Sequence, residues 1–491
     1  MSKPTRDQLP ELLHQIAQMG SYGRAESEPE QGFLRRFLPL PEHARALDPD
    51  VILVIGDRGA GKTELFRAIQ FPAGLAAIQK LGSGADLPDP RRSKWLIGFS
   101  TTGTMFPPEL VFRQFSQGRQ PGDIQLIWLG LLLRCLYRNR VLDAPTLPEA
   151  THLALTEEPL HLDKVFAAIQ GDLAACFGAI DKLDLSLAQS SSWVFLNYDE
   201  LDRVSAGDWA ELRTILRGLV QFWSSYARRW KRLRPKIFLR RDLFDRVALF
   251  GPDVSKIAAQ RVELLWTTRN LYALTAKRII NHSELLKNYF EAALPRGEKR
   301  GELGWFPMEE NANGYRRFIE RLCGKFMGAN PTKGQSFTWI PNHLQDGNGR
   351  VLPRSMVRLF ETAAEIEREN QKADWPRLLH HTSLRGAVDL VSVSRVQEIE
   401  DEEFPWMRTI RERLATLHPQ VPMDRRELEQ RLAIKWDGIS EQPPETSGHG
   451  LLQLLMELGI FYLRADGRVD ARDLYLKGFG LKRKGGVKRP N

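Results

Sequence analysis

Residues 51–67 read VILVIGDRGAGKTELFR, and this stretch decides the fold. Its first half is apolar and β-branched, which predicts a buried strand, and its second half predicts a helix that begins at Lys-Thr. The glycine-rich turn between them fills the pattern G-x-x-x-x-G-K-[ST] with Gly56, Gly61, Lys62 and Thr63. Strand, turn and helix in this order predict a phosphate-binding P-loop rather than an ordinary glycine turn.

The residue types of this loop suit a nucleoside triphosphate. Glycines let backbone N–H groups close around a polyphosphate, because no Cβ stands in the way, and the helix N-terminus adds a favourable dipole. Lys62 would reach the β- and γ-phosphates, and the Thr63 hydroxyl would hold Mg²⁺. No guanine-specific N-K-x-D run is present, so we expect ATP, although GTP stays open. The expected nucleotide contacts are Gly56, Asp57, Arg58, Gly59, Ala60, Gly61, Lys62, Thr63 and Glu64.

The composition is that of a globular chain with a basic excess. The 491 residues suffice for two to four domains, and 42% hydrophobic with 27% charged residues is typical of soluble proteins. The longest apolar stretch, 126–133, is too short to span a membrane, and the N-terminus lacks a signal-peptide core. Cys135, Cys176 and Cys323 lie far apart, so we expect no cysteine metal site, no disulfide framework, and a cytoplasmic setting.

A second motif, VFLNYDELDRV at 194–204, supplies the partner that a P-loop needs. A buried strand over 193–198 would deliver Asp199 at its carboxyl end, where ligands sit in open parallel sheets. Asp199 would hold the Mg²⁺ shell, and the adjacent Glu200 could polarise an attacking water. A glutamate at this place favours hydrolysis over transfer to a small molecule. The alternative is a strand that ends in a solvated acidic turn.

Strands alternate with helices through the first half of the chain, which predicts a mostly parallel α/β sheet covered on both faces. Further strands are expected at 95–100, 236–239 and 262–266, and helices at 108–137, 160–189, about 209–234, 268–294, 314–327, 354–370 and 404–434. A loop rich in Gly, Asn and Pro is expected over 328–352, and a helix over 451–459 is expected to precede a hairpin that turns at 465–467. The expected domains are an N-terminal helical segment (1–45), a P-loop core with a helical insertion near 104–190 (46–266), a helical lid (267–375), a helical linker region (376–436), and a winged-helix-like domain with a basic tail (450–491).

The P-loop together with the acid–acid strand end resembles the additional-strand P-loop ATPases, which include the AAA+ and STAND groups. The run DELDR at 199–203 is similar to the D-D-L-D-R run of the KAP-type P-loop NTPases, and the resemblance covers about 40–370. KAP proteins typically carry membrane segments in the ATPase domain, and this chain has none. The resemblance therefore implies a soluble relative, with the bacterial ATPases of defence against mobile DNA as one option by analogy.

The resemblance implies further residues at the nucleotide. In these families the strand after the acidic one ends in a polar sensor, which here is Arg240 or Arg241; either could read the γ-phosphate or act as a finger toward a neighbouring subunit. The alternative is a strand-end arginine that pairs with Asp242 or Asp245. A lid helix that starts at Pro353-Arg354 would let Arg354 reach back to the nucleotide, and the alternative is a Pro-initiated surface helix.

Two basic stretches are candidates for contact with double-stranded DNA. Residues 228–234 (RRWKRLR) end a predicted long helix, and the tail 477–491 carries six cations and no acid. Counterion release would supply affinity in both cases. The alternatives are a solvated helix end and a tail folded on acids of the chain. The candidate contacts in the tail are Lys482, Arg483, Lys484, Lys488 and Arg489.

These observations predict an Mg²⁺-dependent ATPase in which hydrolysis drives a conformational or assembly switch. The resemblance implies a homo-oligomer, and Asp202 with Arg203 either pair across a subunit boundary or form a plain local ion pair. A different class of function is a nucleotide-gated scaffold or sensor with little turnover that recruits a partner effector. A third is a DNA-binding protein with ATP as a regulatory ligand.

Overall fold

A computed structural model describes residues 4–20, 28–82, 87–101, 104–204, 209–245, 259–417, 419–439 and 441–485. The chain forms two compact units. Pro39–Leu265 is called the sheet unit below, and Met1–Leu38 together with Trp266–Asn491 is called the helical unit. The sequence predicts the end of the P-loop core at 266, one residue past the unit boundary at 265/266. The predicted N-terminal segment 1–45, by contrast, is divided, and most of it belongs with the helical unit.

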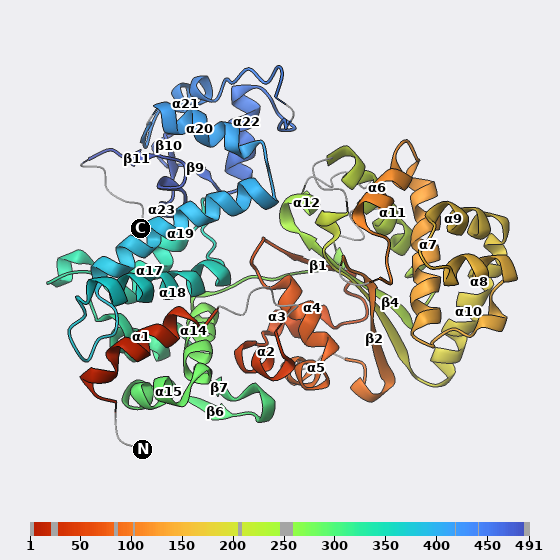
Figure 1. Cartoon of the computed structure of the whole chain (residues 1–491), viewed down its shortest axis with the longest axis horizontal. Helices are drawn as coiled ribbons and strands as arrows, with labels where there is room; N and C mark the ends of the chain where they lie inside the picture. The colour runs from red at the N-terminus through yellow and green to blue at the C-terminus, as the bar shows by residue number, and fades with distance from the viewer. Residues whose placement is uncertain are drawn as a thin grey trace. The chain divides into compact units, whose positions relative to one another are not determined.

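The sheet unit is built on five parallel strands in the order β2-β3-β4-β1-β5, which confirms the predicted α/β P-loop sheet (Figure 1). The strand β4 lies between the P-loop strand β1 and the acidic strand β3, so the sheet has the additional strand that the resemblance implies. The strands are β1 (Leu53–Gly56), β2 (Ser93–Phe99), β3 (Trp193–Tyr198), β4 (Leu233–Arg240) and β5 (Arg261–Glu263).

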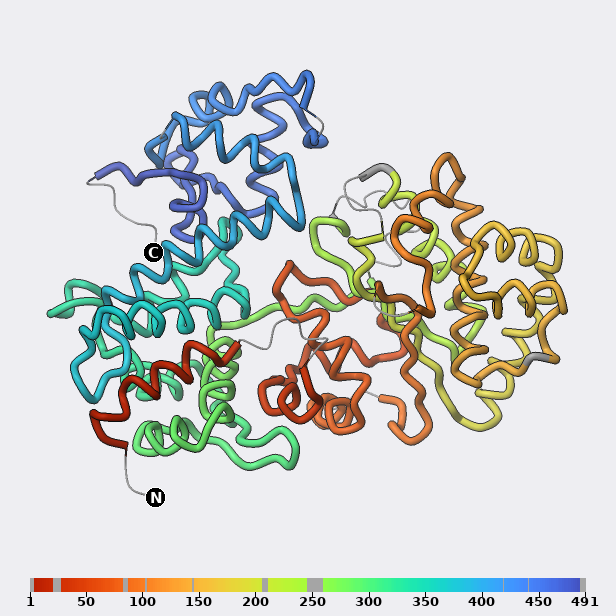
Figure 2. The backbone as a smooth tube through the Cα atoms, in the orientation of Figure 1, coloured from red at the N-terminus to blue at the C-terminus, as the bar shows by residue number. Residues whose placement is uncertain are grey.

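Helices cover both faces of this sheet, as the backbone trace in Figure 2 shows. On one side are α3 (Pro41–Ala46), α4 (Lys62–Gln70) and α5 (Pro72–Gln79); on the other are α7 (Pro121–Arg138) and α11 (Trp209–Tyr226). Apolar residues of α11 at helical spacing, among them Ile215, Leu216 and Leu219, are fully buried. The α7 residue Trp128 is also fully buried, and its indole N–H donates to the Ile215 carbonyl at 3.2 Å. This core fixes the strands whose carboxyl ends carry the candidate site.

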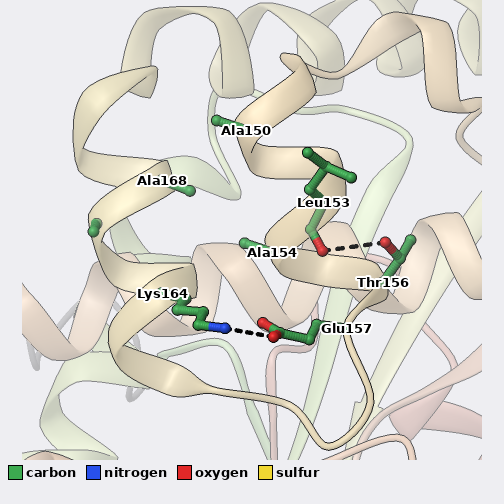
Figure 3. A pocket seen from close by; sticks show the side chains of 8 residues that line it. Ala150, Leu153, Ala154, Thr156, Glu157, Lys164 and Ala168 are labelled. Carbon is green, nitrogen blue, oxygen red and sulfur yellow. Dashed lines mark hydrogen bonds and ion pairs between the residues drawn. The ribbon is translucent and has the colours of Figure 1, made fainter.

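The insertion is helical as predicted, but its helices are shorter. The expected continuous stretch 108–137 breaks at Gly118, which has φ +73, and at Pro121, which starts the next helix. The stretch 160–189 breaks at Asp172. Besides α7, the helices are α6 (Glu109–Ser116), α8 (Glu149–Thr156), α9 (Leu162–Gly171) and α10 (Leu173–Gln189). A hollow between α8 and α9 is lined by small side chains such as Ala154 and Ala168, with an ion pair of Lys164 and Glu157 at one end (Figure 3).

The helical unit joins the start of the chain to its second half. Helix α1 (Leu9–Ala17) packs against α18 (Pro353–Asn370), which also packs against α19 (His381–Glu402). The loop predicted over 328–352 is wrong in part, because it holds the helix α17 (Ser336–Leu344), whose Pro341 is buried. The other helices and strands before α18 are α2 (Glu30–Arg36), α14 (Thr268–His282), α15 (Glu284–Phe290), β6 (Gly297–Lys299), β7 (Trp305–Pro307) and α16 (Arg316–Cys323).

The C-terminal part contains the predicted helix and hairpin. Helix α22 (Gly448–Glu457) is followed by β9 (Phe461–Leu463) and β10 (Val469–Ala471), which pair antiparallel across the predicted turn, where Gly467 has φ +81. The elements before and after are α20 (Met407–Leu417), β8 (Gln420–Val421), α21 (Arg425–Arg431), α23 (Asp473–Leu476) and β11 (Lys482–Arg483). The winged-helix interpretation stays a prediction. Within the described residues, no helix is long and apolar enough to cross a membrane.

We expect the stability of the helical unit to depend on pH through Glu361 of α18. Burial raises the pKa of this carboxyl to about 7, against the opposing effect of the Arg278 and Arg358 guanidiniums. A Cβ added at Gly20 would lie 2.1 Å from the Glu361 carboxylate, so the N-terminal segment closes over it. Because its pKa is higher in the folded than in the unfolded chain, the folded state binds more protons between pH 4.5 and about 7. Its stabilising contribution is therefore complete below pH 4.5 and is lost as the pH rises through 7.

The test is Glu361→Gln, followed by thermal unfolding from pH 4.5 to 8. The amide keeps an acceptor for Gly20 but cannot ionise, so the variant should be more stable than the wild type by roughly 1–3 kcal/mol at pH 8. The difference should vanish toward pH 4.5. Glu369→Gln, at an exposed position of the same helix, is the matched control and should leave the pH profile unchanged. Parallel profiles of wild type and Glu361→Gln would contradict the prediction.

Candidate nucleotide-binding site

The P-loop connects the end of β1 to the start of α4 within the sheet unit. Gly59 has φ +82 and Gly61 has φ +95, a left-handed backbone that only glycine adopts without strain. A Cβ on Gly56 would lie 3.1 Å from the Ala60 Cβ, so the loop folds tightly on itself. The first N–H groups of α4 have no partner inside the helix and can donate to an anion at this end.

The ammonium of Lys62 is turned into this loop. It donates to the Gly56 carbonyl at 2.8 Å and to the Asp57 carbonyl at 3.2 Å. Burial lowers the pKa of Lys62, and the negative charges of Asp202 and Asp199 oppose that effect. The amine thus lies at the mouth of the loop against two carbonyls, where a phosphate oxygen can replace them.

Asp199 and Thr63 meet across the sheet edge as the sequence predicts. The Thr63 hydroxyl donates a hydrogen bond to the Asp199 carboxylate, and Asp199 is 4% exposed. Burial raises the pKa of Asp199 to about 6. Its Oδ2 atom has no hydrogen-bond partner among the residues that the structure describes. A buried carboxylate oxygen without a partner, next to a hydroxyl, fits an Mg²⁺ ion, which takes one or two protein oxygens and keeps waters and phosphate oxygens.

The Glu200 carboxylate lies at the same edge but is held by neighbours that the sequence does not reveal. Its Oε2 accepts from the Ser100 hydroxyl at 3.1 Å, the Thr101 N–H at 3.0 Å and the Thr101 hydroxyl at 2.5 Å. Its Oε1 forms an ion pair with Arg203 at 3.0 Å. Glu200 also has φ +56, a conformation that costs a residue with a Cβ about 1–2 kcal/mol. The polar residues after β2 and the strained backbone together fix this carboxylate.

The two strand-end arginines are engaged with acids. Arg240, which is 5% exposed, bonds Asp242 through two nitrogens at 3.0 and 2.8 Å, as the alternative interpretation expected. It also reaches Asp202 at 3.4 Å. Arg241 contacts Glu263 of β5 at 2.7 Å and Asp57 of the P-loop at 3.4 Å. Both arginines thus border the loop, and a sensor or finger role for either one stays a prediction.

Arg203 and Asp202 have intrachain partners in this structure, Glu200 and Arg240 respectively. These contacts fit the local ion-pair interpretation, and pairing across a subunit boundary stays a prediction. Ser100, Thr101 and Glu263 are site residues that the sequence reasoning missed. Ser100 and Thr101 follow the predicted strand WLIGFS, and their place after a strand that neighbours β3 is the signal that could have found them.

Arg354 lies in the helical unit, in the first turn of α18. Its side chain is 50% exposed and stands 3.7 Å from Glu398, which Arg358 also contacts. Such a weakly held guanidinium is free to take another anion, and its contact with the nucleotide stays a prediction.

The basic tail is structured in its first part. The Arg483 guanidinium donates to Asp470 at 3.1 Å and Asp473 at 3.0 Å, so this candidate is folded on acids of its own domain and is not a free phosphate contact. Lys482 and Lys484 are exposed. Lys488 and Arg489 lie outside the described residues.

Comparison with known proteins gives distant structural similarity. No protein-family model and no curated protein matches the chain. Among solved structures, the chain is similar to the Aeropyrum pernix ORC2 protein in ADPNP–ADP complexes, with 14% identity, a TM-score of 0.38, and coverage of 97% of this chain and 92% of that one. It is also similar to a Walker-type ATPase of Pyrococcus abyssi, with 14% identity, a TM-score of 0.38 and coverage of 91% and 99%. It is similar as well to Cdc6p from Pyrobaculum aerophilum, with 14% identity, a TM-score of 0.27, and coverage of 87% of this chain and 86% of that one. A likeness this distant assigns neither a family nor an activity.

Proposed function

We propose that the chain binds ATP with Mg²⁺ and hydrolyses it. One observation carries the proposal: the P-loop residues Lys62 and Thr63 meet Asp199 at the carboxyl edge of the sheet, and Glu200 stands beside Asp199. The two motifs are more than a hundred residues apart in the chain. An ordinary glycine turn and a solvated acidic turn, the alternative interpretations of the two motifs, would not be expected to meet in one buried site.

Each type of residue at the site supplies a different part of the proposed reaction. The loop N–H groups and Lys62 would bind and orient the phosphates, because both are donors directed at one spot. Thr63 and Asp199 would hold Mg²⁺, which neutralises charge on the phosphates when bound. Glu200 would orient the attacking water and take its proton at a carboxylate oxygen. That role requires Glu200 to leave Ser100 and Thr101, or to use the oxygen that Arg203 now contacts.

A second candidate function has a specific observation in its favour. With its carboxylate bonded by Ser100, Thr101 and Arg203, Glu200 is occupied in this structure. A protein that stays in this arrangement would bind ATP and turn it over slowly, as expected of a nucleotide-gated scaffold or sensor that recruits an effector. The two candidates share the binding site and differ in whether Glu200 is released.

The wider roles rest on the resemblance and stay predictions. They are a switch of lid and C-terminal domain, assembly into a homo-oligomer, contact of the C-terminal cations with double-stranded DNA, a cytoplasmic setting, and a part in defence against mobile DNA. ATP as a regulatory ligand of a DNA-binding protein belongs with them.

The test is release of phosphate from ATP and from GTP by the purified full chain, with Mg²⁺ or with EDTA, beside a separate measurement of nucleotide binding. We expect release that needs Mg²⁺ and that is lost in Asp199→Asn. Asp163→Asn, a change at an exposed acid that pairs with Arg119, should have no effect. Tight binding without release would favour the scaffold, and absence of binding would overturn both candidates.

A further inference from the structure

The amino edge of the sheet carries a group of exposed cations, at the opposite ends of the strands from the P-loop. The strands β2, β3 and β4 are adjacent and parallel, so the segments that enter them meet at one edge. Arg91 and Arg92 precede β2, Lys94 is the second residue of β2, and Arg228 and Lys231 precede β4. All five residues are exposed, and none of them is in an ion pair with another residue that the structure describes.

Several acids lie at this edge. The exposed Asp89 accepts from the Arg91 N–H at 2.9 Å, and Asp50 lies 3.6 Å from Arg234. Asp181 pairs with Arg229 at 2.5 Å and accepts from the Trp230 indole N–H at 2.9 Å. Asp184 is buried and accepts the N–H groups of three consecutive residues, 231–233, at 2.7–3.1 Å. Asp181 and Asp184 hold the turn before β4 in place, and neither is in an ion pair with the five exposed cations. Asp89 adds one negative charge beside Arg91 and Arg92, so the edge keeps an excess of positive charge.

Aromatic rings lie between the two groups of cations. Trp95 of β2 stacks on Phe195 of β3 with ring centroids 4.0 Å apart and planes 11° apart. Trp193, at the start of β3, is nearly parallel to Phe195, with centroids 5.9 Å apart and planes 12° apart. The Arg232 guanidinium lies 4.4 Å from the Trp193 centroid. Phe195 is fully buried, whereas both tryptophans remain partly exposed.

We propose that this amino-edge patch, formed by Arg91, Arg92, Lys94, Trp95, Trp193, Arg228 and Lys231, binds single-stranded nucleic acid. Phosphates would contact the cations, and unpaired bases would stack beside the two tryptophans and Arg232. A duplex offers phosphates but hides the faces of its bases, so it would contact the cations, and none of its bases would stack on the tryptophans. The combination of excess positive charge with aligned, partly exposed tryptophans therefore favours single strands over a duplex or a lipid surface.

The patch is distinct from the nucleotide site. Trp193 is the first residue of β3 and Asp199 follows its last, so the strand separates the two by about 20 Å at ~3.3 Å per residue. Binding at the patch should not compete with ATP. The proposal does not rest on ATP hydrolysis, and its failure would leave the proposed function intact.

The test uses fluorescence anisotropy of the full chain with a labelled 20-nucleotide oligo(dT), oligo(rU) and a 20-base-pair duplex, over a range of salt concentrations. Arg91→Ser, Arg92→Ser and Lys94→Ser combined should lower the salt slope of log K for the single strands by about 2, because each lost phosphate contact removes about 0.7. Trp193→Leu should weaken binding roughly 5- to 150-fold without changing that slope. Trp193→Phe should keep most of the affinity. The basic tail is intact in all variants, so its contribution cancels.

The controls separate the patch from general charge and from damage to the fold. Lys80→Ser, Arg140→Ser and Arg217→Ser combined remove three exposed cations elsewhere in the sheet unit and should leave binding nearly unchanged. ATP binding and the thermal midpoint should match the wild type in every variant. The proposal is overturned if the control triple weakens binding equally, if Trp193→Leu has no effect, if the duplex binds as tightly as single strands, or if phosphatidylserine vesicles bind the patch and oligonucleotides do not.

Discussion

Glu200→Gln should lower the rate of ATP hydrolysis by about 10²- to 10⁴-fold, the usual contribution of a general base. The amide keeps the size of the side chain and can still accept from Ser100 and Thr101, so the site should remain folded. It cannot take a proton from water. Affinity for Mg²⁺-ATP should stay near that of the wild type, because Lys62, Thr63 and Asp199 are unchanged. Steady-state phosphate release and nucleotide titration, run on the same preparation, measure the two effects separately.

Glu157→Gln is the matched control, since Glu157 is a carboxylate of the helical insertion whose described contact is with Lys164. Its turnover should equal that of the wild type. A Glu200→Gln variant with undiminished turnover would show that another group handles the water, and the assignment of Glu200 would be wrong. A parallel loss of ATP affinity and turnover would instead point to a structural role in the loop.

The local patterns were sufficient to predict the two halves of the site. The P-loop could be predicted because strand, glycine turn and helix are contiguous, and the left-handed Gly59 and Gly61 need no distant contact to explain them. Asp199 could be predicted because a parallel sheet brings the carboxyl ends of its strands to one edge. The strand order, with β4 between β1 and β3, agrees with the additional strand that the resemblance implies.

The partners of these residues could not be predicted, because they depend on contacts between distant parts of the chain. Thr101 lies 99 positions before Glu200, and only the adjacency of β2 and β3 brings them together. The pairing of Arg483 with Asp470 depends likewise on how the C-terminal strands fold back. Pro341 sits inside α17 against the usual effect of proline, so the sequence predicted a loop where tertiary packing maintains a helix. In each case tertiary context outweighs the local preference.

Release of Glu200 from its present partners connects the two candidate functions. If Ser100 and Thr101 hold the carboxylate away from the water, their loss should raise basal turnover, whereas loss of Glu200 lowers it. If instead they orient Glu200 for the reaction, both changes should lower turnover. The hydroxyls of Ser100 and Thr101 thus decide whether the arrangement in this structure is a resting or a reactive one.

Lys62→Ala should weaken ATP binding roughly 30- to 4,000-fold, the range expected when one partner of a buried charge pair is removed. The ammonium is held by the Gly56 and Asp57 carbonyls at 2.8 and 3.2 Å, so it is already in place for the phosphates and pays little entropy to bind them. Turnover should disappear at ATP concentrations that saturate the wild type. The measurement is calorimetric titration with Mg²⁺-ATP.

Loss of a buried charge beside Asp199 and Asp202 could also disturb the fold, so the thermal midpoint of Lys62→Ala must be recorded with the affinity. Lys80→Ala, at the exposed end of α5, is the matched control and should bind ATP as the wild type does. Without the Lys62 ammonium, which now lowers the pKa of Asp199, the pKa of Asp199 in the folded protein should rise further. The variant should therefore be destabilised most at high pH, where Asp199 is ionised. A folded Lys62→Ala protein with unchanged ATP affinity would mean that the loop binds phosphate through its N–H groups alone, and the site as described here would lose its central cation.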